Sequence, residues 1–136
     1  MSKALRIDWR YSIGEGAAEL DQVIEIARAS QNLTALSVSH AYHVMRCEVT
    51  GDVVPVLAHG REAVNYAERT GHQIARIFAY LCLGLANVLS GAWHDALEVL
   101  GAALTIGRER RLAVFEGGVL AVMAGGISAS VMVQSP

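Results

Sequence analysis

The sequence predicts an all-α fold of five or six antiparallel helices, stacked as hairpins in a right-handed solenoid. Apolar residues recur at helical spacing along most of the chain. The 136 residues contain only two prolines, Pro55 and Pro136, which leaves long stretches free to form helices. When the sequence is shifted so that Gly51 falls on Gly91, apolar positions of the following segments also align. We call this separation the repeat interval, because similarity at a fixed interval is typical of stacked helical units.

The predicted domain organisation is a single repeat domain with short ends. A chain of 136 residues suits one domain. Residues 1–13 mix charged and apolar side chains without a clear period and are assigned to an N-terminal arm. The repeat domain is expected at 14–133, followed by a tail at 134–136.

The first two helices are expected at about 15–30 and 33–50. The first carries apolar residues at helical spacing at Leu20, Val23, Ile24 and Ala27. Gly51 is expected to end the second helix, because glycine readily adopts the left-handed conformation of a helix end. Asp52 is then expected to accept hydrogen bonds from the first amides of the next helix.

The third helix is expected to have Pro55 in its first turn, where the missing N–H is tolerated, and to end near Arg69. Gly71 marks its end. The fourth, fifth and sixth helices are expected over about 73–90, 93–110 and 112–131.

The best-formed hairpin is residues 77–110, which resembles a tetratricopeptide repeat. Tyr80 takes an aromatic position of that pattern, Leu83 and Gly84 follow it, and Ala96 with Leu100 takes the A-x3-F position. The resemblance implies close helix crossing, with the small residues Gly84 and Ala96 facing each other. Leucine at either position should therefore unfold the hairpin.

Two longer stretches resemble one group of bacterial proteins. HGREAVNYAERTGH and AYLCLGLANVLSGAWHDALEVLGAALTIGRERRL are similar to the C-terminal repeat region of bacterial adenylate/guanylate cyclases and of large ATP-dependent transcriptional regulators. The resemblance covers about residues 20–124 and implies a role in signalling or regulation. The cyclase catalytic segment and a phosphate-binding loop do not occur in the sequence, so that chemistry is not carried over.

Tetratricopeptide arrays usually bind through the concave face formed by the first helix of each pair. The resemblance places this face at Phe78, Leu81, Leu85 and Val88, and in the earlier unit at Val38, Ala41, Met45 and Glu48. The face is mostly apolar, unlike the basic clamps that hold acidic peptide ends. It would suit a protein or peptide partner, with a small apolar ligand as the alternative. A tight superhelix would instead make these residues ordinary core.

Catalytic and metal-binding patterns are weak. His40, His43 and Cys47 share a helical face and are soft ligands, yet a fourth ligand is not evident, so neither a metal nor another cofactor is expected. Buried histidines with backbone partners, which would add pH sensitivity, are the preferred interpretation. The sequence contains no Gly-x-Ser-x-Gly, HExxH or GxxxxGK[ST] motif, and a non-enzymatic protein is expected.

The composition of the chain limits its expected partners and cellular location. Eleven Lys and Arg against thirteen Asp and Glu give a net charge of −2, and without a basic surplus a nucleic-acid partner is not expected. Two cysteines without a CxxC pair favour a reducing cytoplasm. The uncharged run 117–133 is at the short limit for a membrane span, so burial against a second copy of the chain is preferred and a homodimer is predicted. A membrane-associated adaptor remains the third functional alternative.

Overall fold

The computed structural model describes the backbone of residues 17–134 and, apart from residues 17, 114, 115 and 126–134, their side chains. Regular secondary structure in this part of the chain is α-helical throughout. The helices follow one another as α2 (Ala17–Ala29), α3 (Leu33–Thr50), α4 (Val56–Thr70), α5 (Gln73–Leu89), α6 (Trp93–Glu109) and α7 (Ala113–Gln134). The all-α class and the six predicted helices are confirmed, with bounds close to those expected.

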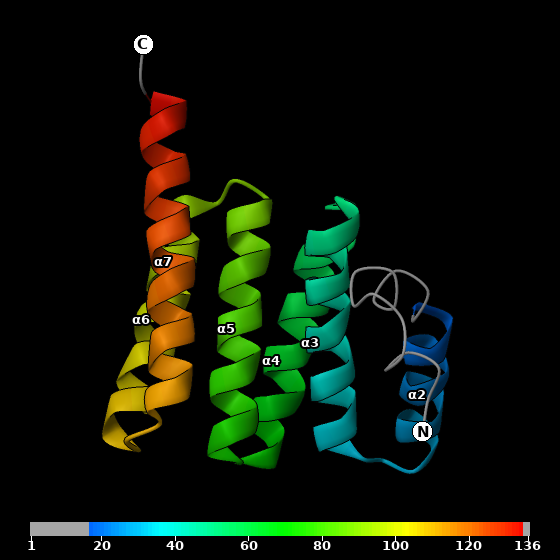
Figure 1. The fold of residues 1–136 in the computed structure, drawn as a ribbon. Coiled ribbons are helices and arrows are strands. Elements are labelled where there is room, and N and C mark those ends of the chain that lie inside the picture. The colour runs from blue at the N-terminus through cyan, green and yellow to red at the C-terminus, as the bar shows by residue number, and fades with distance from the viewer. Residues whose placement is uncertain (1–16, 135–136) are drawn as a thin grey trace.

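Consecutive helices run antiparallel and pack against each other (Figure 1). The helices α3, α5 and α7 point the same way, and α5 contacts both of the others. The helices α4 and α6 run in the opposite direction behind them in the view of Figure 1. Equivalent positions of α3 and α5 are therefore brought side by side.

Residues with a left-handed backbone conformation occur at even spacing along the described chain. Positive φ angles occur at Gln31 (55°), Gly51 (78°), Gly71 (67°), Gly91 (80°) and Arg111 (55°), so that successive positions are half a repeat interval apart. Each lies just after the end of a helix, where the left-handed conformation reverses the chain. The glycine ends predicted at Gly51 and Gly71 are confirmed, whereas Gln31 and Arg111 fill the same role without being glycine.

The starts of α3, α5 and α7, at Leu33, Gln73 and Ala113, are one repeat interval apart. Two of these starts have the same cap. Asn32 Oδ1 accepts a hydrogen bond from the Ala35 amide at 3.0 Å, and His72 Nδ1 accepts one from the Ala75 amide at 3.4 Å. In both helices, the side chain just before the helix thus caps a free amide of the first turn, at equivalent positions of the repeat.

The core consists of two larger apolar clusters and a smaller one. The largest lies between α3, α4 and α5 and includes Val44, Cys47, Val56 and Cys82. A second lies between α5, α6 and α7, around Ile77, Leu100, Ala103 and Val119. The smallest holds α2 in place with Ile24, Ala27 and Leu36. The contribution of α2 to this small cluster is limited to two buried side chains, Ile24 and Ala27.

Glycine allows close packing at two helix pairs. A Cβ at Gly84 of α5 would overlap the side chain of Leu100 in α6, which confirms close approach at this glycine. The three atoms nearest to a Cβ at Gly84 all belong to Leu100, and Ala96 is buried in α6, so the facing of Gly84 and Ala96 stays a prediction. A Cβ at Gly60 of α4 would lie only 3.2 Å from the Cα of Leu83 in α5.

Three further expectations concern the start of α4, the N-terminal arm and a membrane span. Asp52 does not cap α4: its Oδ1 accepts from the Val54 amide at 3.3 Å, and the N-cap residue is Pro55. The loop that ends with Pro55 therefore separates Asp52 from the helix it was expected to cap. The predicted arm at 1–13 lies outside the described residues. None of the described helices is both long and apolar enough to cross a lipid bilayer.

Candidate functional site

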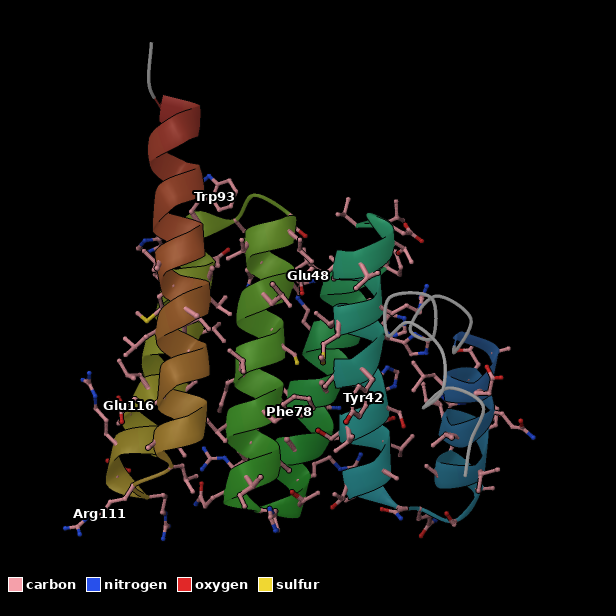
Figure 2. The ribbon with its side chains drawn as sticks, viewed as in Figure 1. Tyr42, Glu48, Phe78, Trp93, Arg111 and Glu116 are labelled. Carbon is pink, nitrogen blue, oxygen red and sulfur yellow. The ribbon has the colours of Figure 1, made fainter. Side chains whose placement is uncertain are left out.

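A mostly apolar depression of the surface lies between the N-terminal halves of α3 and α5. It has a volume of about 350 Å³ and is lined by Thr34, Val38, Tyr42, His72, Ile74, Ala75 and Phe78. We call it the α3–α5 groove. The Tyr42 and Phe78 rings meet edge to face, with centroids 5.9 Å apart, and both project between the two helices in Figure 2. An edge-to-face contact of this kind is a favourable aromatic geometry.

The groove follows from the repeat interval. Thr34 and Val38 of α3 correspond to Ile74 and Phe78 of α5. Because the two helices are parallel neighbours, these equivalent positions lie across the groove from each other. Tyr42 is 47% exposed and Ile74 is 48% exposed, so the two side chains present apolar surface to solvent.

The structure brings together only part of the predicted concave face. Val38 and Phe78 both line the groove. Ala41 is completely buried in the core, so its side chain is not available to a partner. Leu81 packs against the α5–α6–α7 cluster, on a different side of α5.

The other predicted residues lie further along the same helices. Met45 and Leu85 are half-buried against the α3–α4–α5 core, and Val88 is half-buried. Glu48 is exposed near the end of α3 (Figure 2). These side chains do not line the groove.

Sequence reasoning missed Tyr42 and Ile74, the two exposed large hydrophobic residues of the groove. Residues four apart on a helix share a face. Stepping four positions from Val38 leads to Thr34 and Tyr42, and stepping back from Phe78 leads to Ile74. Helical spacing therefore pointed to these residues. On α5, however, the predicted face was extended from Phe78 toward Leu85 and Val88 instead of back toward Ile74.

The groove lining has no Lys, Arg, Asp or Glu side chain. Its polar groups are the hydroxyls of Thr34 and Tyr42 and the imidazole of His72. A charged ligand would lose hydration there without gaining an opposite charge. The lining instead suits apolar side chains with a few hydrogen-bonding groups.

The histidines considered as metal ligands are buried, but their partners are side chains. His40 Nδ1 lies 2.9 Å from His59 Nδ1, and His43 Nε2 lies 3.0 Å from Asp21 Oδ1. The expected backbone partners are therefore wrong. In the described part of the chain, no group of three or more His, Cys, Asp or Glu side chains has an arrangement that could hold a metal. Burial also raises the pKa of the Cys47 thiol, which disfavours the metal-binding thiolate.

Comparison with protein-family models, with curated proteins and with solved structures finds no match for this chain.

Proposed function

We propose that this chain is a non-catalytic protein-interaction module that binds an amphipathic helix of a partner protein in the α3–α5 groove. The observation that carries the proposal is the exposed apolar surface of Tyr42 and Ile74 on either side of Val38 and Phe78. An amphipathic helix presents apolar anchors at i, i+3, i+4 and i+7, and such anchors fit a groove between helices.

The architecture that we propose is a tetratricopeptide-like solenoid. The constant repeat interval between the starts of α3, α5 and α7 supports it, as do the contacts of α5 with both α3 and α7. The resemblance to repeat regions of bacterial cyclases and ATP-dependent regulators supports a scaffold role in signalling. Two buried thiols are compatible with a reducing cytoplasm, where we place the protein.

The test is selection of helical peptides from a displayed library on the purified full chain. We expect enriched peptides to carry apolar residues at helical spacing. Binding of a selected peptide to Tyr42→Ala should be weaker by about 30-fold, because exposed aromatic residues are common binding hot spots worth roughly 2 kcal/mol. Titration calorimetry would measure the difference.

Ile26→Ala is the matched control, because Ile26 is an exposed apolar residue of α2 outside the groove. It should leave peptide affinity unchanged. Peptides that bind Tyr42→Ala and the wild type equally, or a selection without helical spacing of apolar residues, would sink the proposal.

A small apolar ligand is the second candidate occupant. The groove volume of about 350 Å³ lies at the lower end of the range typical of small-molecule sites, roughly 300–1,000 Å³. A ligand that binds only the folded chain raises the melting temperature with its concentration. Thermal-shift screening of apolar compounds should give shifts that Tyr42→Ala removes, and uniformly flat results would reject this candidate.

We also propose that α7 forms a homodimer interface. Gly117, Leu120, Ala121 and Ala124 are exposed on α7, and the helix extends beyond the ends of α5 and α6 in Figure 1. Small side chains next to a leucine would let a second α7 approach closely. Light scattering after size exclusion should give a dimer for the wild type and a monomer for Leu120→Glu. A monomeric wild type at micromolar concentration would refute this.

A further inference from the structure

A second cavity is formed where the C-terminal ends of α2 and α4 lie at the same end of the molecule as the start of α3 (Figure 1). It has a volume of about 360 Å³ and is lined by Arg28, Gln31, Leu33, Leu36, Tyr66 and Arg69. We call it the arginine pocket. It shares no lining residue with the α3–α5 groove, so the function proposed above does not use it.

Two later turns of the same kind are closed by ion pairs. At the α4–α5 turn, Arg76 Nε donates to Glu68 Oε1 at 2.9 Å. At the α6–α7 turn, Arg108 Nε donates to Glu116 Oε1 at 3.1 Å. Each pair joins the last turn of one helix to the first turn of the next, so that charge is matched across the turn.

The equivalent positions at the α2–α3 turn hold a cation and a leucine. One repeat interval before Glu68 and Arg76, the chain has Arg28 and Leu36. Leu36 is only 3% exposed and has no group that accepts a hydrogen bond. Arg28 instead pairs within its own helix, where its Nη1 donates to Glu25 Oε1 at 2.6 Å. A guanidinium has five N–H groups, so this single bond leaves donors for an anion in the pocket.

The second cation of the pocket, Arg69, is positioned by an aromatic ring. Its guanidinium carbon lies over the Tyr66 ring, 5.7 Å from the centroid. The Tyr66 ring stacks in turn on His40, with centroids 5.9 Å apart and an angle of 14° between the planes. A guanidinium on an aromatic face keeps its N–H donors in its own plane, where they can form a fork with a carboxylate. The stacking therefore restricts Arg69 without using its donors.

The rest of the lining supplies apolar surface and one amide. Leu33, Leu36 and Tyr66 all belong to the small apolar cluster between α2, α3 and α4. Gln31 adds a side chain that can both donate and accept hydrogen bonds. Asp and Glu are absent from the described residues that line the pocket. An anionic group would therefore meet two guanidinium groups, while an apolar body attached to it would cover leucine side chains.

The helix ends favour an anion with a single charge. Arg28 and Arg69 lie in the last turns of α2 and α4, where the helix dipole contributes a partial negative charge. This charge attracts arginine, and it opposes a group with two negative charges such as phosphate. A carboxylate carries one charge and matches the guanidinium fork. The volume lies at the lower end of the range for small-molecule sites, roughly 300–1,000 Å³.

We propose that the arginine pocket binds a small carboxylate that has an apolar body. The carboxylate group pairs with the guanidinium groups of Arg28 and Arg69. The apolar body covers Leu33 and Leu36. Because the pocket and the α3–α5 groove have no residue in common, failure of one site would not imply failure of the other.

Titration of the full chain with phenylbutyrate, followed by NMR, tests the pocket. Phenylbutyramide is the matched probe, because it has nearly the same shape without the charge. We expect phenylbutyrate to bind at least about tenfold more tightly, since hydrogen bonds to a charged group are stronger than those to a neutral one. The methyl signals of Leu33 and Leu36 should shift, whereas those of Ile74 in the groove should not.

Three variants assign the role of the charges. Arg69→Gln should weaken phenylbutyrate binding by about tenfold, because it removes the fork of charged donors. Glu25→Gln should strengthen binding by about two- to threefold, because it releases Arg28 from one exposed ion pair. A gain in affinity does not arise from a damaged fold. Arg61→Gln is the matched control, because Arg61 is an exposed arginine of α4 outside the pocket, and it should leave the affinity unchanged.

The proposal is overturned if phenylbutyrate does not bind at millimolar concentration, or if it binds no more tightly than phenylbutyramide. It is equally overturned if Arg69→Gln and Arg61→Gln bind alike, or if Glu25→Gln brings no gain. Inorganic phosphate that binds as tightly as phenylbutyrate would reveal an anion site without an apolar part and would contradict the proposal. Shifts at Ile74 in place of Leu33 and Leu36 would move the ligand to the groove, with the same consequence.

Discussion

The hairpins α3–α4 and α5–α6 are one repeat interval apart in the chain. We call the contact between the two helices of a hairpin its seam, and the two seams are made by different kinds of side chain. In α5–α6 the contact includes Gly84 and the buried Leu100, whose side chain fills the space of a Cβ at Gly84. In α3–α4 the contact includes the His40–His59 bond and a bond from Ser37 Oγ to the Ala63 carbonyl at 2.8 Å.

Each histidine of the α3–α4 hairpin has an equivalent position in the α5–α6 hairpin. One repeat interval after His40, His43 and His59, the chain has Tyr80, Leu83 and Val99. Leu83 and Val99 do not titrate, whereas burial lowers the pKa of His40 and of His59, so that protonation of these rings costs stability. We therefore expect the α3–α4 hairpin to be more sensitive to acid than the α5–α6 hairpin.

The largest predicted effect would break the apolar seam. Gly84→Leu inserts a side chain into the space of Leu100, and overpacking should destabilise the chain by more than about 3 kcal/mol and abolish a single cooperative transition. Urea unfolding followed by circular dichroism would measure it. Gly101→Ala is the control, because its Cβ would meet nothing and an alanine in a helix should add roughly 0.5–1 kcal/mol. A wild-type midpoint for Gly84→Leu would mean that the seam is loose.

A second prediction would convert the polar seam into the apolar one. The triple change His40→Tyr, His43→Leu and His59→Val installs the residues found at the equivalent positions of the next hairpin. One pH unit below 6.5, the wild type should have lost about 1 kcal/mol of stability for each histidine that stays neutral when folded, and the variant should have lost none of it. Unfolding midpoints from pH 8 to pH 5 would show this. A variant that retains the wild-type slope would place the pH dependence elsewhere.

The smallest predicted effect concerns the left-handed positions that both hairpins share. Gln31→Gly and Arg111→Gly should each stabilise the chain by about 0.5–1 kcal/mol, because a side chain strains this conformation. Gly91→Ala should destabilise by a similar amount, since only Trp93 comes within 4 Å of the added Cβ and a clash is excluded. Thermal unfolding would measure all three variants. The melting temperature should rise for Gln31→Gly and Arg111→Gly and fall for Gly91→Ala, and any other pattern would contradict the prediction.

The sequence predicted the helices well because its signals were local. Gly51 and Gly71 marked helix ends that the structure confirms. Gln31 and Arg111 gave no such signal, because their left-handed conformation follows from the repeating interval and not from residue type. Asp52 was misassigned, because the segment 53–55 lies between it and the start of α4 at Val56.

The candidate site was predicted only in part because it depends on contacts between distant residues. Helical spacing identifies a face, but it does not tell which stretch of that face a neighbouring helix leaves open. Val38 and Phe78 were found, whereas Ala41 proved buried. The side-chain partners of His40 and His43 were not predicted for the same reason, because they are 19 and 22 residues away in sequence.

The even spacing of left-handed residues restricts how this chain can change in length. One helix and its turn fill the stretch from one such position to the next. A single deletion inside a helix would rotate everything after it by about 100°, since an α-helix has roughly 3.6 residues per turn. Duplication of residues 33–72 would instead add a complete hairpin and return the chain to the same phase. We therefore expect the fold to tolerate insertion of a whole hairpin better than a shorter change of length inside a helix.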